Sequence, residues 1–225
     1  MIEIPVHNQT GEAVGTLEID ERLLGGSVRP ALLKQAYVRF HANRRIGAAK
    51  TRTRSELSHS GRKLYRQKGT GQARRGDRNA NLLVGGYHAH AKRPRSWRQD
   101  MPVKMRRLAN RNALLAKVID GEIKVVDSLQ FEKPSTRQFT QVLKNLGIDR
   151  SCLLALDDTR TDAALSARNL DQVSLTQIDR LNAFDVLNHR YLLAERGALE
   201  AYLGQMQQRP ISHKQSGEQP QEAAV

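Results

Sequence analysis

The 225-residue sequence contains one cysteine, Cys152, and no long apolar run. A single cysteine excludes a framework of intramolecular disulfides. No stretch approaches the roughly 20 apolar residues that a membrane-spanning helix needs. The first residues, MIEIPVHNQTGE, lack the basic and apolar regions of a secretory signal peptide. We therefore expect a cytoplasmic protein that makes no use of a membrane, with Cys152 packed in the core.

Acidic residues are scarce in one block of the chain. Residues 41–111 contain 20 Lys or Arg and 3 Asp or Glu, whereas the remainder contains 17 and 20. The formal net charge of +14 therefore arises from about a third of the sequence. Charge runs are usually solvated surfaces, but an excess of one sign at this density repels itself unless anions neutralise it. The pattern predicts a polyanionic partner, with nucleic acid favoured over an anionic membrane surface.

The chain outside this block has the pattern of a folded α/β domain. A hairpin is expected in residues 1–20, with its turn at 8–12. Helices are expected at 27–42 and 100–121. From residue 122 strands and helices alternate, which is typical of an open, mostly parallel sheet with helices on both faces. The strands are predicted at 122–127, 151–157, 173–178 and 191–195, and the helices between and after them at 135–146, 161–168 and 197–207.

The basic block itself predicts an arm rather than a second core. A loop of more than fifty residues is unusual in a compact domain unless it has a function of its own, and its apolar residues are sparse. We expect a body formed by residues 1–45 and 99–208, an extended RNA-binding arm at 46–98, and a disordered polar tail at 209–225.

The composition of the arm favours RNA over duplex DNA. Arginine and lysine suit phosphates, and glycines allow the backbone to approach a ligand closely. The rings of Tyr65, Tyr87 and Trp97 lie among basic residues and could stack on unpaired bases. Helix-turn-helix, zinc-finger and basic-zipper patterns, which read duplex DNA, are absent from the sequence.

Three short motifs suggest more specific functions, but the sequence supports each of these functions only weakly. Lys68 precedes the glycines of its GTG motif, whereas a Walker loop places its lysine after them. His88 and His90 form a His-x-His pair without a convincing third metal ligand. Asp157 and Asp158 end a predicted strand, where open α/β sheets place their sites, but an acidic pair there more often caps a helix.

Two other classes of function remain as alternatives. A nucleic-acid enzyme with the arm as a clamp would need a cluster of metal-binding carboxylates, yet Glu56, Asp77 and Asp100 are far apart in the block. A membrane-surface protein would need a broad apolar helix face beside the lysines. The arm lacks that pattern, and arginine outnumbers lysine in it, which favours forked phosphate contacts.

The motif RQKGTGQAR, at residues 66–74, resembles the tip of the bacterial form of large-subunit ribosomal protein four. The segments 42–76, 93–118 and 184–203 are similar to the same family in order along the chain. The resemblance implies an open α/β body and a loop that penetrates large-subunit ribosomal RNA and helps to line the peptide exit tunnel. It also implies assembly with neighbouring ribosomal proteins, without catalytic residues, metal, cofactor or small-molecule substrate.

The candidate RNA-binding residues are carried over from this resemblance and from the composition of the arm. The tip comprises Arg66, Gln67, Lys68, Gly69, Thr70, Gly71 and Arg74. The shaft comprises Arg44, Arg45, Lys50, Arg52, Arg54, Arg62, Lys63, Arg93, Arg95, Lys104, Arg106 and Arg107. Tyr65, Arg75 and Trp97 complete the predicted interface.

Overall fold

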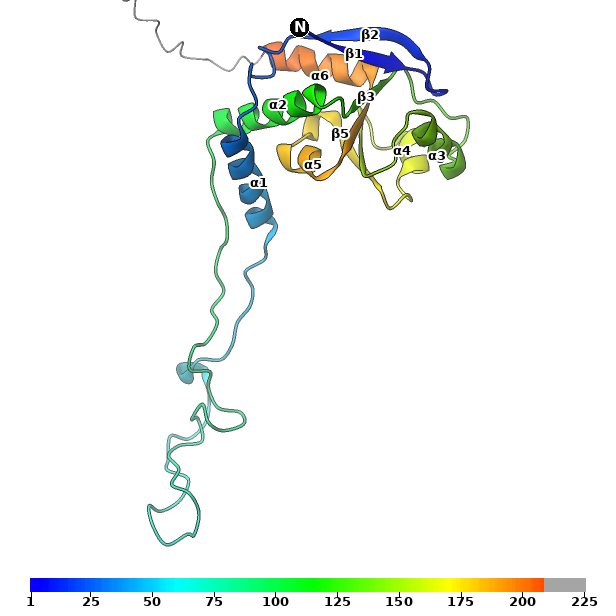
Figure 1. Cartoon of the computed structure of the whole chain (residues 1–225). Helices are drawn as coiled ribbons and strands as arrows, with labels where there is room; N and C mark the ends of the chain where they lie inside the picture. Colours follow the sequence, from blue (N-terminus) through cyan, green and yellow to red (C-terminus); the bar gives the residue numbers. More distant parts are fainter. Residues whose placement is uncertain (209–225) are drawn as a thin grey trace, which may run out of the picture. The chain divides into compact units, whose positions relative to one another are not determined.

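Six strands form one sheet in the order β2-β1-β3-β6-β4-β5 in the computed structural model of the protein, which describes residues 1–208 (Figure 1). All neighbouring strands are parallel except the pair β1 and β2. The strands are β1 (Ile2–His7), β2 (Ala13–Ile19), β3 (Ile123–Val126), β4 (Cys152–Leu156), β5 (Val173–Gln177) and β6 (Tyr191–Glu195). The predicted α/β class is thus confirmed, and the predicted tail at 209–225 lies outside the described residues.

The N-terminal hairpin is joined to the sheet, which the sequence did not indicate. Strands β1 and β2 pair antiparallel from Ile2 opposite Ile19 onward. Their turn is closed by the Asn8 side chain, whose Oδ1 accepts hydrogen bonds from two backbone amides. β1 then pairs parallel with β3, with Val6 opposite Val125. The hairpin therefore extends one edge of the sheet.

Strand β4 lies inside the sheet, and all five of its residues are buried. Leu153 and Ala155 pack into a cluster with residues of α2 and α6, whereas Cys152 and Leu154 pack into a second cluster with residues of α3 and α4. Helices therefore cover both faces, as a continuous apolar strand requires. Burial raises the pKa of the Cys152 thiol to about 12, so this group stays protonated within the core.

Six α-helices and two short 3₁₀-helices complete the described chain. They are α1 (Pro30–Arg44), α2 (Val103–Ile119), α3 (Thr136–Asn145), α4 (Asp162–Ala167), α5 (Ala183–Asn188), α6 (Arg196–Gln208), η1 (Arg54–Glu56) and η2 (Ile178–Arg180). Ser135 and Gln138 match the capping-box pattern, which predicts an N-cap at Ser135. The structure confirms this cap, since the Ser135 side chain accepts from the amide of Gln138. Helix α5 was missed because six residues are too few to show a helical period.

The acidic pair after β4 does not cap a helix, contrary to expectation. Thr161 is the N-cap of α4, and its side chain accepts from the amide of Ala164. Asp158 lies one turn earlier, where its carboxylate accepts from the amide of Arg160 and its carbonyl from the hydroxyl of Thr161. The hydroxyl at Thr161 thus takes the role that the sequence gave to the carboxylates.

Helix α2 is packed by polar residues as well as by its apolar face. Helical spacing in the sequence places Met105 and Ile119 on the apolar side with Leu108, Ala109 and Leu115, but these two residues are 36% and 61% exposed. Arg111 and Asn112 are buried instead, and the Asn112 amide donates to the carbonyl oxygen of Leu24 at 3.0 Å. Arg111 donates to the carbonyl of Met206, and burial lowers its pKa. Polar side chains of α2 therefore bind segments that are distant in sequence. Apolar periodicity does not predict such contacts.

The described chain divides into two compact units. Unit 1 comprises Met1–His41 and the residues from Asp100 onward, and unit 2 comprises Ala42–Gln99. The sheet and nearly all helical residues belong to unit 1. No helix among residues 1–208 is long and apolar enough to cross a bilayer.

Candidate nucleic-acid interface

Unit 2 contains little regular secondary structure. Apart from the last turn of α1, its one helical segment in the described chain is η1. Among its 58 residues, 16 are Lys or Arg and 2 are Asp or Glu. This difference equals the formal net charge of the whole chain, +14. The segment lacks the apolar periodicity that would stabilise helices or strands by packing.

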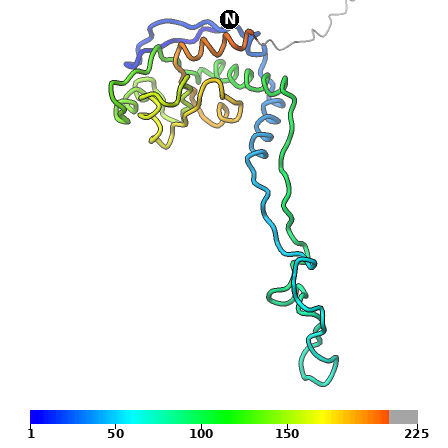
Figure 2. The backbone as a smooth tube through the Cα atoms, turned by 180° about the vertical axis from the view of Figure 1, so that it is seen from behind, coloured from blue at the N-terminus to red at the C-terminus, as the bar shows by residue number. Residues whose placement is uncertain are grey.

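Isolated hydrogen bonds join the two segments of unit 2 into a long hairpin (Figure 2). Asn43 and Gln99 are joined twice through the Asn43 side chain. Further along, the amide of Arg95 donates to the carbonyl of Gly47, and the amide of Thr51 donates to that of Lys92. Each pair lies nearer to the tip on both segments, so the two segments run antiparallel. A Cβ at Gly47 would overlap the carbonyl of Arg95, so this close approach requires glycine.

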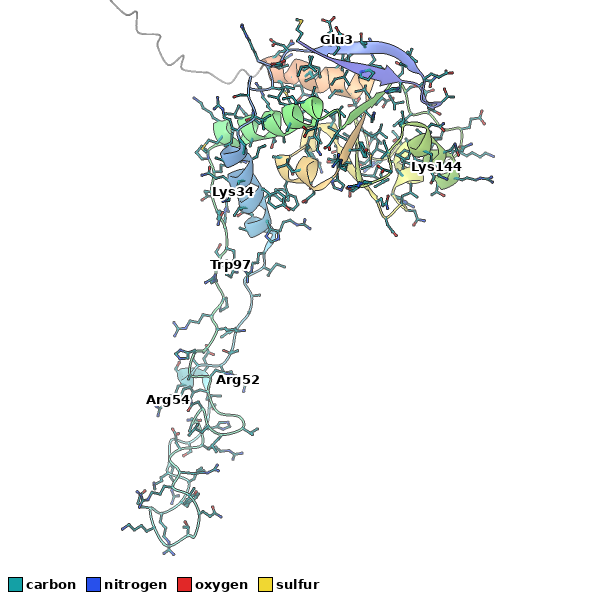
Figure 3. The ribbon with its side chains drawn as sticks, in the orientation of Figure 1. Glu3, Lys34, Arg52, Arg54, Trp97 and Lys144 are labelled. Atoms are coloured by element: carbon teal, nitrogen blue, oxygen red, sulfur yellow. The ribbon has the colours of Figure 1, made fainter. Side chains whose placement is uncertain are left out.

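Trp97 is enclosed by two arginines of the predicted shaft (Figure 3 labels Trp97). The Cζ atoms of Arg45 and Arg95 lie 3.6 and 3.3 Å from the centre of its ring system. Two guanidinium groups this close to one ring must lie on opposite faces, because they would overlap on the same face. Both faces of Trp97 are therefore occupied by cations that attract its π system, and they are not open for a base.

The two acidic residues of unit 2 each pair with a predicted RNA-binding cation. Lys50 contacts Glu56 at 3.1 Å, and Arg54 contacts Asp77 at 3.4 Å. Glu56 also accepts from the backbone amide of Thr53, the residue that precedes η1. The hydrogen bond from Lys50 is the main cause that lowers the pKa of Glu56. These contacts form where the hairpin carries its only helical turn.

A tight turn beyond η1 centres on Asn79, the one buried residue of unit 2. The carbonyl of Asn79 accepts from the amide of Tyr87, and its side-chain amide donates to the carbonyl of His59 at 3.3 Å. Gly86 approaches the carbonyl of Ala80 so closely that a Cβ would overlap it. The backbone here is fixed by polar contacts and by one glycine rather than by apolar packing.

The tip is a small loop closed by side-chain contacts with the backbone. Tyr65 donates its hydroxyl hydrogen to the carbonyl of Ala73, and Arg66 donates to the carbonyl of Gly69 at 2.7 Å. Gly69 and Gly71 adopt φ values of +79° and +66°, a region that side chains disfavour. Lys68, which precedes Gly69, and Thr70, which lies between the two glycines, have exposed side chains. The motif therefore builds a turn that presents a cation.

The 22 predicted interface residues are divided between the two units. Nineteen belong to unit 2, and Lys104, Arg106 and Arg107 belong to α2 in unit 1. Every predicted Lys and Arg is exposed, whereas Tyr65 and Trp97 are half-buried. The prediction omitted Arg78, Lys92 and Arg98, which are also exposed cations of unit 2 and could have been found from charge alone.

The geometry gives little support to the other candidate sites that the sequence suggested. The backbone amide of His88 donates to the carbonyl of Arg52, so His88 forms part of the hairpin. Within residues 1–208 no group of three or more His, Cys, Asp or Glu side chains is arranged to hold a metal ion. Asp157 and Asp158 line a cavity of about 580 Å³ with Asp162 and Glu195 at the carboxyl ends of the strands.

Comparison with known proteins identifies the family of the chain. The sequence pattern of the "Ribosomal protein L4/L1 family" matches residues 17–204. The chain is 40% identical over 198 residues to the "Large ribosomal subunit protein uL4" of Dehalococcoides mccartyi (strain CBDB1), which covers 88% of this chain and 94% of the relative. It is 39% identical over 199 residues to the protein of the same name from Moorella thermoacetica, covering 88% and 96%. The chain therefore belongs to the ribosomal protein L4/L1 family, whose members are structural constituents of the ribosome and not enzymes.

Proposed function

We propose that the protein is a constituent of the large ribosomal subunit, that it binds the ribosomal RNA of that subunit through unit 2, and that residues 46–98 act as an extended arm. The names of its relatives support the first part. The observation that carries the second part is the segregation of charge. All of the net charge lies in a unit that has almost no core and two acids.

The hairpin is suited to a partner that supplies anions. Unit 2 contains sixteen cations and two acids, Glu56 and Asp77, so most of the cations have no carboxylate of their own unit to neutralise them. The cross-links are one or two hydrogen bonds at a time, mostly at exposed sites, and each bond contributes little to stability. Phosphates of folded RNA would neutralise the cations on both segments, and the arm would become ordered as it binds.

The tip favours a specific place in the subunit. The GTG turn presents Lys68 and Thr70 on a loop that Arg66 and Tyr65 close. The resemblance of residues 66–74 to the family tip supports a position near the peptide exit tunnel, beside other ribosomal proteins. A basic arm that orders with RNA would also support assembly of the subunit, because it would join RNA segments that are distant in sequence.

Hydrogen exchange tests the proposal directly. We expect amides of residues 46–98 to exchange rapidly in the free protein and to become protected when large-subunit ribosomal RNA is added, while unit 1 is protected in both states. Strong protection of residues 46–98 without RNA would show an independently folded domain and would contradict an arm that orders on binding. Unchanged exchange with RNA present would exclude unit 2 as the RNA interface.

A charge reversal at the tip sharpens this test. Lys68→Glu should reduce RNA protection around the tip without changing the unfolding temperature of unit 1. The matched control is Lys144→Glu on α3, an exposed cation outside the predicted interface (Figure 3). Equal loss of RNA binding in both variants would show that only total charge matters, and a lowered unfolding temperature with Lys68→Glu would contradict the separation of the two units.

A further inference from the structure

Helices α1, α2 and α5 of unit 1 enclose a cavity of about 230 Å³. Arg39 on α1 and Arg106 on α2 both line it, and no acidic side chain does. Arg106 belongs to the predicted RNA-binding set, whereas Arg39 was not predicted. The cavity is therefore an electropositive site in unit 1, formed entirely by residues outside the hairpin.

Arg39 presents an unpaired donor in this place. Its Nε is buried, and within residues 1–208 it has no hydrogen-bond partner. A buried donor without an acceptor is unfavourable, and in native proteins such a group usually has an explanation in an ion, a water or a functional role. The guanidinium is also a charge, which increases the cost of leaving it without a partner.

The polar neighbours of Arg39 direct their hydrogen bonds to other groups and leave its Nε without a partner among residues 1–208. The Asn110 side chain donates to the carbonyl of Leu181 at 3.1 Å and accepts from the amide of Ala183 at 3.0 Å. Asn182 is engaged in the same way with Asp185, through its side-chain amide and its side-chain oxygen. Neither amide oxygen accepts from Arg39 in this arrangement, so an external anion would supply an acceptor that the neighbours do not.

Aromatic packing holds the site in a fixed shape. The rings of Phe40 and Phe184 stack with centroids 4.5 Å apart, and Tyr37 lies 4.8 Å from Phe184. The hydroxyl of Tyr37 donates to the Asn188 side chain at 2.8 Å. This contact joins α1 to α5 and keeps the Arg39 side chain beside an apolar wall, where its interaction with an anion is less screened by water.

We infer that this cavity binds one phosphate group of RNA, with the guanidinium groups of Arg39 and Arg106 as its donors. Arginine forks match the geometry of phosphate oxygens. Unit 1 would then contact RNA through a defined site of its own, in addition to the contacts of the hairpin. The inference rests on the proposed function, because it takes RNA as the partner.

The first test is the salt dependence of RNA binding by the full-length chain. The probe is a large-subunit ribosomal RNA transcript, and the variants are Arg39→Gln and Lys34→Gln. Lys34 is an exposed cation on the same helix that does not line the cavity (Figure 3). We expect Arg39→Gln to reduce the slope of log K against log salt by about 1, the value for one lost phosphate contact, and Lys34→Gln to leave it unchanged.

Protein stability separates a binding role from a structural one. If Arg39 serves an external anion, Arg39→Gln removes an unpaired buried donor, so the unfolding temperature of the free protein should stay the same or rise. A fall in unfolding temperature would indicate a structural role and overturn the inference. An unchanged salt slope with Arg39→Gln, or an equal loss with Lys34→Gln, would overturn it as well.

Two further measurements identify the ligand. Arg39→Gln and Arg106→Gln should be non-additive in RNA affinity if both side chains hold the same phosphate, and additivity would contradict a shared site. The Nε–H resonance of Arg39 should shift with RNA; a shift with inorganic phosphate alone that RNA does not reproduce would assign the cavity to a free anion instead. Failure of the unaltered protein to bind RNA would reject the proposed function, whereas binding unaffected by Arg39→Gln would reject this inference alone.

Discussion

Side chains of unit 1 point into two apolar clusters, whereas in residues 42–99 the one buried side chain is the amide of Asn79. Leu154, Leu193 and Phe139 in unit 1 are fully inaccessible, while Leu82 and Val84 in unit 2 are 89% and 103% exposed. Burial of apolar surface offsets the entropy of ordering a chain. Unit 1 is therefore stabilised by its own apolar core, whereas unit 2 depends on a partner for most of its stabilisation.

The same contrast holds for charges. In unit 1, Glu122 is 11% exposed and pairs with both Lys117 and Arg190. In unit 2, the pairs of Glu56 and Asp77 involve cations that are more than half exposed. One unit uses ion pairs inside its fold, and the other leaves most of its cations facing solvent. Stability and binding are thus encoded in separate parts of the chain, which can be tested by altering each part alone.

Deletion of residues 58–89 should produce the largest difference between the two units. It removes seven Lys and Arg and one acid, so the slope of log K against log salt for RNA binding should fall by about 6. Unfolding of unit 1 should remain cooperative at an unchanged temperature, because the deleted residues contribute little to the core. Calorimetry checks the second statement, and loss of the cooperative transition would show that unit 1 needs the hairpin.

The reaction rate of a thiol in each unit measures how well that unit shields its side chains from solvent. Cys152 is fully buried, so its reaction with a disulfide reagent should require opening of the fold and be about 10³–10⁶ times slower than in the unfolded chain. In a Cys152→Ala background, Ser58→Cys should react at nearly the rate of a free thiol, since Ser58 is exposed. Slow reaction at residue 58 without RNA would contradict a weakly ordered unit 2.

The same substitution can be made in the ion pair of each unit. Glu122→Gln leaves the buried Lys117 without its carboxylate and should lower the free energy of unfolding by about 3 kcal/mol. Glu56→Gln should leave global unfolding unchanged, because the Lys50 pair is exposed. Chemical denaturation measures both. A comparable loss for Glu56→Gln would show that the hairpin is coupled to the fold.

The Glu56 pair should also respond to pH. Its pKa in the folded state is lowered, chiefly by the hydrogen bond from Lys50, so its stabilising contribution is present above the unfolded pKa and is lost as pH falls through the lower folded value. Acidification should increase amide exchange around η1 in the unaltered protein. The increase should be absent in Glu56→Gln.

Local patterns predicted unit 1 well where a segment determines its own structure. The apolar run of β4 and the cap at Ser135 depend on neighbouring residues, and both were found. The parallel pairing of β1 with β3 joins residues that are more than a hundred positions apart, and it was missed for that reason. In α2, Arg111 and Asn112 are buried by partners in distant segments, which apolar periodicity does not show.

The candidate interface was predicted by charge, whereas its geometry was not. Charge counts need no contacts, so the exposed cations were identified almost completely. The cross-links of the hairpin join residues that are distant in sequence, such as Gly47 and Arg95, through one or two hydrogen bonds, and no periodicity reports them. The cavity at Arg39 likewise depends on three helices that meet only in the folded chain.

Trp97 offers the smallest and most local test of the comparison. Trp97→Ala removes the ring that Arg45 and Arg95 share, and contacts of this type are worth about 0.5–1 kcal/mol each at exposed sites. Amide exchange near Gly47 should accelerate several-fold while the unfolding temperature of unit 1 stays unchanged. Tyr87→Ala is the matched control, because Arg54 lies farther from that ring, at 5.9 Å, and its effect should be weaker.

The fluorescence of Trp97 decides what this side chain does in the complex, since it is the only tryptophan in the sequence. If the arginines keep the ring enclosed when RNA binds, its emission should change little and iodide quenching should stay low. If a base displaces one guanidinium and stacks on the exposed face, emission should be strongly quenched by RNA. In the first case Trp97 positions two phosphate-binding arginines, and in the second those arginines protect a stacking surface until RNA replaces one of them.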